Sequence, residues 1–407
     1  MPVGQRQGFG AFWAARAASQ FGDEITILAL PWLVAAETGS PLAVGLLEAL
    51  VFAPVLLVGL PIGAWADRRS RKRSMIEADL LRLVLLASIP AAVLAGSGAN
   101  LGHVMVVAFL AGVGRIAFEA SAQAFLPDLV PRAQIVRANS RLSLTEGLAA
   151  VLGPATAGVL IATVGASGAI ALDAVTFALS AGMLWLVWVA KENYGAVRER
   201  MGPAIRAGLR ATARNAFVRT LSLTMGAANV GSGIAIGMMT IFLQNTLHLD
   251  GWQAGIIYAS NGVGAVVAAS LSPRLSSRVG IARAILIGLS CATLGLVLLA
   301  VSQTSTWFVT ATLGDALVGC GIVINIISSA SLRQRTVLPE LLGRVTVSYR
   351  LVVNGAVALG AIVGGVVGEA VGVREAIGVG VAIYVVVTLA ALRTCLNGPD
   401  PQGVVVT

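Results

Sequence analysis

Long apolar runs, each about as long as a membrane-spanning helix, alternate with short polar turns along the whole chain. A helix needs roughly 20 consecutive apolar residues to cross a bilayer. Twelve runs have about this length, and we expect spans at 9–36, 41–65, 74–95, 101–126, 139–164, 167–190, 220–247, 252–272, 281–301, 307–331, 346–371 and 375–396. The pattern therefore predicts an all-α polytopic protein with twelve transmembrane helices, a multi-pass protein of the cell membrane.

Composition supports this interpretation. Of the 407 residues, 57% are hydrophobic and only 12% are charged, whereas an average soluble domain is about 25% charged. The net charge of +9 would suggest nucleic-acid binding in a soluble protein. In a membrane protein it indicates basic cytoplasmic turns instead, so we expect contact with membrane lipid and no nucleic-acid partner.

The cations are distributed unevenly between the turns. Alternate turns, near 68–73, 132–141, 191–219, 274–283 and 333–344, are rich in Arg and Lys, while the intervening turns contain only Arg374. Turns rich in Lys and Arg stay on the cytoplasmic side of a membrane. The distribution therefore places these turns, and both termini, in the cytoplasm.

The two halves of the chain resemble each other. Leu126-Pro-Asp-Leu-Val130 follows the fourth span, and Leu338-Pro-Glu-Leu-Leu342 follows the tenth. A parallel repeat of six spans is a transporter architecture. We therefore expect two pseudo-symmetric six-helix bundles, 1–190 and 220–407, joined by a cytoplasmic linker, 191–219.

The linker contains a basic segment in which three arginines are spaced four residues apart. In a helix, Arg206, Arg210 and Arg214 would share one face, which could lie on anionic lipid headgroups. A solvated linker helix explains the same spacing, and the sequence leaves both interpretations open.

The turn after the second span carries a recognisable pattern, Gly63-x-x-x-Asp67-Arg68-x-x-Arg71-Lys72. In a chain with two related halves, it resembles the loop signature of the major facilitator superfamily, with Ser70 where glycine is usual. The resemblance covers nearly the whole chain. It implies two bundles around a central cavity, which the halves expose to each side of the membrane in turn.

Two further segments resemble drug-efflux members of that superfamily. Gly153-Pro154-x-x-Ala-Gly158 in the fifth span is similar to the Gly-Pro motif of drug antiporters. Arg16-x-x-Ser19-Gln-Phe-Gly22-Asp23 in the first span, with Asp173 in the sixth, resembles the branch that contains macrolide-efflux proteins and siderophore exporters. The resemblance implies a bend at Pro154 that keeps the cavity sealed against leak. Tight helix packing is the alternative explanation for these glycines.

The resemblance also implies a gate at the charged turn. Asp67 would face the positive end of a helix in the other half, and Arg68 and Arg71 would bridge to nearby carboxylates. Alternatively, the turn only sets the topology of the chain by its charge. For Asp67 we favour the gate.

Charged side chains inside the spans are candidates for proton or cation coupling, because inserting each one costs at least ~2.5–3.5 kcal/mol. Asp23 and Asp315 lie on spans that the resemblance places at the cavity. Arg115 and Glu119 are four residues apart in the fourth span, so we expect them to pair. Such a pair can exchange a proton when a cation approaches the carboxyl group, or it can be a static brace.

For three other carboxylates we expect structural or solvated positions and no part in transport. We expect structural pairing for Glu48 and Asp173, and solvation for Glu146 near the cytoplasmic surface.

A cavity for amphipathic compounds should be broad and apolar with a few polar groups. Candidates to line it are Trp13, Gln20, Asn229, Met238, Phe242 and Asn325. Packing between helices, or contact with lipid, is the alternative for each of these side chains.

These observations together predict a proton-coupled antiporter that exports amphipathic organic compounds, with a small molecule and protons as its partners. A proton-coupled importer of a polar nutrient and a non-transporting membrane sensor or scaffold are the alternatives. No nucleophile set, metal-ligand spacing or phosphate-binding loop is apparent, so we expect no enzyme activity and no cofactor. We expect a monomer.

Overall fold

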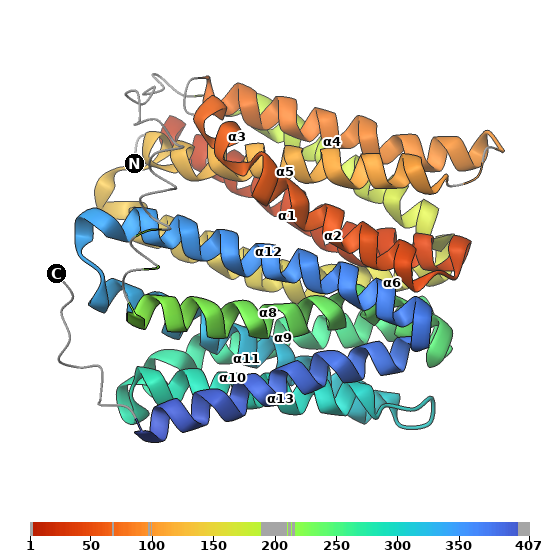
Figure 1. Ribbon diagram of the computed structural model, residues 1–407. Helices are drawn as coiled ribbons and strands as arrows, with labels where there is room; N and C mark the ends of the chain where they lie inside the picture. Colours follow the sequence, from red (N-terminus) through yellow and green to blue (C-terminus); the bar gives the residue numbers. More distant parts are fainter. Residues whose placement is uncertain are drawn as a thin grey trace. The chain divides into compact units, whose positions relative to one another are not determined.

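The computed structural model describes residues 3–66, 69–96, 98, 100–188, 210, 213 and 216–397. Within these ranges the chain is helical and contains no strand. The helices of the first part are α1 (Val3–Thr38), α2 (Pro41–Leu57), α3 (Gly59–Ala66), α4 (Arg71–Leu94), α5 (Leu101–Leu129), the short 3-10 turn η1 (Arg132–Gln134) and α6 (Ile135–Trp185). Those of the second part are α8 (Ala216–Ile241), the π-helical turn η2 (Phe242–Thr246), α9 (Gly251–Val279), α10 (Ile281–Ala300), α11 (Trp307–Thr336), α12 (Pro339–Val371) and α13 (Val373–Asn397) (Figure 1).

Each expected span coincides largely with helical residues, with two local differences. The span 41–65 is divided at Val58 between α2 and α3, because Pro54 and Pro61 on either side lack the N–H groups that a continuous helix needs. The spans 139–164 and 167–190 form the two arms of α6, which meet at Gly165 with φ of 76°. Glycine adopts this left-handed backbone without the strain that a Cβ atom would add.

Eight helical segments of the described chain are long and apolar enough to cross a membrane by length and composition, and α2 is apolar but shorter. Helix α4 falls outside this group because Glu77, Asp79 and Arg82 interrupt its first half. That interruption is the first sign of buried charge on this helix.

Two compact units account for most contacts. The first consists of Met1–Gly39, Leu50–Arg198 and Asp250–Ala259, and the second of Ser40–Ala49, Glu199–Leu249 and Ser260–Thr407. Helices α2 and α9 therefore each contribute residues to both units. The linker proposed at 191–219, including Arg206 and Arg214, lies outside the described residues except for Arg210, Ala213 and the start of α8.

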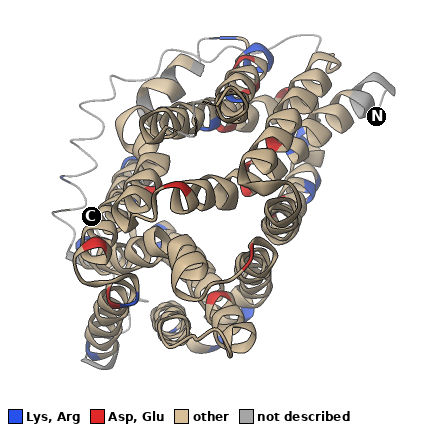
Figure 2. Cartoon of the chain, turned by 90° about the vertical axis from the view of Figure 1, so that its right-hand side faces the viewer, with Lys and Arg blue, Asp and Glu red and all other residues tan. Residues whose placement is uncertain are grey.

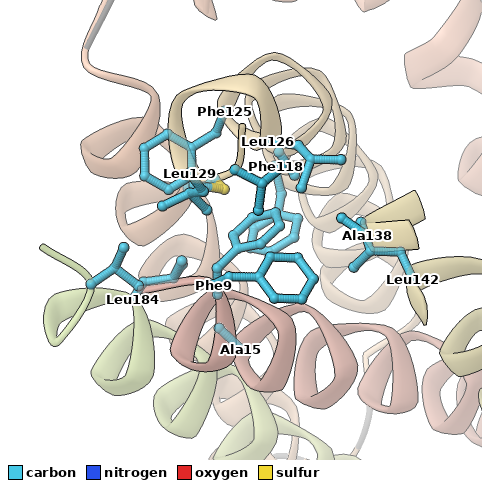
Figure 3. Packing of buried hydrophobic residues seen from close by; sticks show 14 of the residues in the cluster. Phe9, Ala15, Phe118, Phe125, Leu126, Leu129, Ala138, Leu142 and Leu184 are labelled. Carbon is cyan, nitrogen blue, oxygen red and sulfur yellow. The ribbon is translucent and has the colours of Figure 1, made fainter. Parts of the chain in front are cut away.

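The core of the first unit is an aromatic cluster between α1, α4, α5 and the two ends of α6. Figure 3 shows side chains of this cluster gathered between the helices. The rings of Phe12 and Phe125 pack edge to face with centroids 5.7 Å apart, a pair worth about 0.5–1.5 kcal/mol beyond its buried area. This cluster fixes α1 against α5, and so sets the register of the polar residues farther along both helices.

The second unit is packed largely through glycine. Gly288 and Gly295 of α10 lie seven residues apart, and so do Gly314 and Gly321 of α11. A Cβ on Gly295 would lie 2.5 Å from the Gly314 carbonyl oxygen, and one on Gly321 would lie 2.7 Å from the Ala292 nitrogen. Small residues allow such backbone approach in lipid.

The start of α2 joins this unit through a carboxylate of α12. Glu369 Oε2 accepts hydrogen bonds from Ser40 Oγ at 2.8 Å and from the Leu42 backbone nitrogen at 3.2 Å. Below this contact, a Cβ on Gly45 would lie 2.9 Å from the Gly365 Cα. The negative carboxylate of Glu369 is thus in direct contact with the N-terminus of α2, which is the positive end of the helix dipole.

Candidate functional site

A cavity of about 480 Å³ opens among α1, α5 and α6 of the first unit, within the size range of small-molecule sites. Its lining residues are Arg16, Gln20, Asp23, Glu24, Arg115, Glu119, Gln123, Glu146, Ala149 and Ala150. Charged residues are sparse on the helices as a whole, which are mostly tan in Figure 2. Their concentration around one cavity is therefore a specific feature of this unit.

Helical spacing places these side chains on common faces. The polar residues of α1 occupy positions 16, 20, 23 and 24, and those of α5 occupy positions 115, 119 and 123. Intervals of three and four residues repeat on one side of a helix. Each helix therefore presents a polar stripe to the cavity.

Arg16 connects the three helices of the cavity. Its Nη2 lies 3.2 Å from Glu119 Oε2 on α5 and 3.0 Å from Glu146 Oε1 on α6. The Arg16 side chain is only 7% exposed, whereas the Glu119 and Glu146 side chains are 33% and 42% exposed. One buried cation is therefore shared by two accessible carboxylates.

A second, deeper cation lies on α4. Arg82 is 1% exposed and forms ion pairs with Asp23 and, at 3.5 Å, with Asp79. Its Nη1 also donates to Ser19 Oγ at 3.0 Å, and its guanidinium lies 3.8 Å from the centre of the Phe177 ring. A buried charge needs this degree of pairing, since an unpaired ion in a low-dielectric interior is costly.

The expected pairing of Arg115 with Glu119 is wrong in this structure. Arg115 Nε lies 3.7 Å from Asp23 Oδ2, and Glu119 pairs with Arg16. Partners from neighbouring helices replace the local i, i+4 partner, so Asp23 lies between two arginines.

Three further carboxylates of this unit lie in or near the site. Glu146, expected to be solvated, accepts a hydrogen bond from Arg16. Asp173 is fully buried and accepts hydrogen bonds from Thr26 and, at 3.1 Å, from Thr176. Glu24 lines the cavity and forms no ion pair with the described side chains.

Two of the carboxylates singled out from the sequence lie in the second unit. Asp315 on α11 accepts a hydrogen bond from Asn261 Nδ2 at 3.0 Å and does not line the cavity described above. Glu48 is buried in the first part of α2. It makes no ion pair with the described residues, contrary to the pairing expected from its position.

Only Gln20 of the six expected lining residues contributes to this cavity. Trp13 donates to Thr145 Oγ1 at 2.8 Å, and Asn229 donates to the carbonyl of Met225 on its own helix. Met238 and Phe242 are fully buried, and Asn325 is 8% exposed. The last three lie in helix packing of the second unit.

The described part of the loop signature makes specific contacts. Arg71 Nη1 lies 2.6 Å from Asp128 Oδ2 and 2.8 Å from the Ala124 carbonyl oxygen. Lys72 Nζ donates to the carbonyls of Trp185 and Val187 and so caps the end of α6. Gly63 lies on α3, while Asp67 and Arg68 lie outside the described residues.

The glycine motif of α6 faces two different helices. A Cβ on Gly153 would meet the Glu24 side chain of α1, including its Cγ at 3.2 Å. A Cβ on Gly158 would lie 2.7 Å from the Gly255 Cα of α9, and the Pro154 carbonyl approaches Gly255 in the same way. The motif therefore positions a cavity carboxylate as well as a helix contact.

Sequence reasoning missed the charges of α4. Asp79 and Arg82 have opposite sign and are three residues apart within an apolar span, a spacing that allows pairing. Two opposite charges at this spacing inside an apolar span are the signal that identifies them. Glu24 was likewise not singled out, and Arg16 was noted only as part of a motif.

Known proteins resemble this chain over most of its length. A family model described as "Transmembrane secretion effector" matches residues 2–403. The multidrug efflux pump Tap of Mycobacterium bovis (strain BCG / Pasteur 1173P2) is 29% identical over 277 residues, covering 65% of this chain and 66% of the pump. Macrolide efflux protein A of Streptococcus pyogenes is 27% identical over 165 residues, 40% of each chain. The chain thus matches just under two thirds of the pump's length, and less of the macrolide protein.

Solved structures show the same fold. The nucleoside transporter NupG superposes with a TM-score of 0.79 at 12% identity, covering 98% of this chain and 100% of the transporter. A bacterial homologue of the iron transporter ferroportin in an inward-facing state gives 0.76 at 17% identity, covering 95% and 98%. At such identities the likeness concerns the fold alone, and it confirms the all-α fold class predicted from the sequence.

Proposed function

Because the chain belongs to the transmembrane secretion effector family, of drug-efflux type within the major facilitator superfamily, we propose that it is a proton-coupled antiporter that exports amphipathic organic compounds. The family makes it an integral membrane transporter and not an enzyme. Two similar proteins are named for multidrug and macrolide efflux, which supports export of such compounds here. We further propose cytoplasmic termini, and two bundles that expose the substrate site to each side in turn.

The observation that carries proton coupling is the sharing of Arg16 by Glu119 and Glu146. When one of these carboxylates takes up a proton, Arg16 keeps the other as its partner. A proton can therefore bind without leaving a buried guanidinium unpaired, a state that would cost several kcal/mol. Both carboxylates line the cavity and are partly exposed, so a proton has access to them.

The neighbouring charges determine which carboxylate fits this role. The other ionisable groups of the site are Asp23, Glu24, Asp79, Arg82, Arg115 and Asp173. Asp23 is held by two arginines, while Glu119 and Glu146 have one between them. We therefore assign the proton to Glu119 or Glu146, with Asp23 and Arg115 completing the network. Asp315 is kept as a second candidate in the other unit.

The test is transport in inverted membrane vesicles with an imposed proton gradient, using a macrolide and a lipophilic dye. We expect accumulation that a protonophore abolishes. The double variant Glu119→Gln/Glu146→Gln should lose it, while Glu37→Gln, an exposed carboxylate at the end of α1, should not. Gradient-driven accumulation by the double variant would remove the coupling role, and uptake only in right-side-out vesicles would indicate an importer.

The gate proposal for Asp67 needs its own measurement, since this residue lies outside the described residues. Asp67→Asn should reduce transport while leaving membrane insertion intact. Normal transport by that variant would leave the charged turn with a topological role only.

A further inference from the structure

The cavity of the first unit carries an excess of negative charge. Two arginines and four carboxylates line it, a formal excess of two negative charges. Including the deeper Arg82 and its partner Asp79 leaves that excess unchanged. Uncompensated charge in a low-dielectric site is costly, so the cavity favours any occupant that brings positive charge.

The distribution of pairs shows where that charge would bind. Asp23 is neutralised by Arg82 and Arg115. Glu119 and Glu146 divide one guanidinium between them. Glu24 forms no ion pair with the described side chains and feels the charge of Arg115 only at longer range. The deficit of cations therefore lies on the side of the cavity formed by Glu24, Glu119 and Glu146.

Unmet hydrogen-bonding groups give an independent indication of a ligand. Arg16 is nine-tenths buried and lines the cavity, yet its Nε has no hydrogen-bond partner in the described part of the chain. The Oε1 atom of Gln20, another lining residue, is also buried and accepts no hydrogen bond from the described residues. Buried polar atoms are normally paired, and an acceptor such as Gln20 Oε1 suits an ammonium or amide N–H.

We propose that this cavity binds organic cations, and that Arg16 occupies the position of the substrate's cationic group when the cavity is empty. The inference rests on the proposed function and specifies its substrate class. On binding, the cation takes over one of Glu119 and Glu146, and Arg16 keeps the other, so the buried guanidinium is not left unpaired. Arg16 is thus a tethered competitor, which partly neutralises the empty site and yields one carboxylate to the cation.

Three related probes, a cation, an anion and a neutral molecule, test directly whether the cavity prefers positive charge. Tetraphenylphosphonium is a fixed cation, tetraphenylborate is its anionic counterpart of the same shape, and triphenylphosphine oxide is a neutral relative. Their dissociation constants are measured by calorimetry on the purified full-length protein in detergent, at one fixed pH. We expect the phosphonium to bind at least about tenfold more tightly than the neutral or anionic probe, a difference of ~1.4 kcal/mol. Equal or tighter binding of the borate would overturn the inference.

Variants at Arg16 test the competitor role. Arg16→Gln should bind the phosphonium about tenfold more tightly, because the competing charge is gone, whereas Arg16→Lys should stay near wild type. Glu146→Gln should weaken binding, and Glu37→Gln should not change it. A merely structural Arg16 predicts weaker or unchanged phosphonium binding in Arg16→Gln, which would overturn the competitor role. If Arg16→Gln does not fold, Arg16→Lys and Glu146→Gln still test the competitor role. Weaker phosphonium binding in both variants would contradict that role, and so would unchanged binding in Glu146→Gln.

The failure of this inference can be separated from failure of the proposed function. Tight phosphonium binding together with no gradient-driven transport in vesicles would support the substrate class and refute the antiporter. Gradient-driven export of a neutral compound, together with no preference for the phosphonium, would support the antiporter and refute the substrate class.

Discussion

Arg82 offers the sharpest test of how the first unit is held together. Substitution by methionine keeps an unbranched side chain of similar length and removes the charge. Among the described residues, it leaves Asp79 with the hydroxyl groups of Ser19, at 3.3 Å, and Ser180 as its polar partners. Asp23 keeps Arg115 at 3.7 Å. The variant therefore strands one fully buried carboxylate and weakens the pairing of a second.

The size of the effect follows from these contacts. Removing one member of a buried ion pair costs about 3–5 kcal/mol. Because Asp23 retains a partner, we expect the lower end of that range, about 3 kcal/mol, for Arg82→Met. Adding Asp79→Asn removes the stranded charge, so the double variant should recover at least ~1 kcal/mol through their coupling.

The free energy of unfolding can be measured by denaturation of the detergent-solubilised chain, followed by tryptophan fluorescence. Arg137→Met is the matched control, because Arg137 is exposed on α6 and surface substitutions usually stay within about 0.5 kcal/mol. If Arg82→Met unfolds at the same free energy as that control, or if the double variant is less stable than Arg82→Met, the ion-pair network is not what stabilises this unit.

Three further predictions concern other contacts. Gly153→Ala should lower transport in the vesicle assay by displacing the Glu24 side chain. Gly182→Ala on the same helix is the control and should transport normally, because a Cβ there meets nothing within 4 Å. Asp128→Asn should destabilise the fold by about 3 kcal/mol, because Arg71 and Asp128 are largely buried. The exchange Arg71→Asp/Asp128→Arg should restore part of the lost stability in the same denaturation measurement. Glu369→Gln should weaken the cap on α2 by about 0.3–1 kcal/mol, seen as faster hydrogen exchange at Leu42 and Ala43, with Glu37→Gln unchanged.

Hydrophobic run length was enough to predict the helices, because a span must be apolar over the thickness of the bilayer. Run length did not identify the buried charges, because an average over a span conceals single charged residues. In α4, Leu80, Leu81 and the apolar residues beyond them outweigh Asp79 and Arg82 in any such average. Two opposite charges three residues apart inside an apolar run would have been the better signal.

Pairing partners were less predictable than helices, since a sequence shows only local neighbours. The i, i+4 rule joined Arg115 to Glu119, and both side chains do line the cavity. The rule could not account for Arg16 and Asp23, which come from α1 and lie about 100 residues away in sequence. A long-range ion pair with a buried arginine outweighs an exposed local pair, which is worth only about 0.2–0.5 kcal/mol.

The two units differ in the charged contacts that they contain. Every ion pair that the structure describes lies in the first unit. In the second unit the described contacts include close glycine packing on α10 and α11, and Asp315 is held by an amide instead of a cation. Close glycine contacts depend on shape and are insensitive to protons, whereas ion pairs respond to any charge that enters. We therefore expect the charge-dependent steps of transport in the first unit, and the repeat noted between the halves of the sequence does not account for that difference.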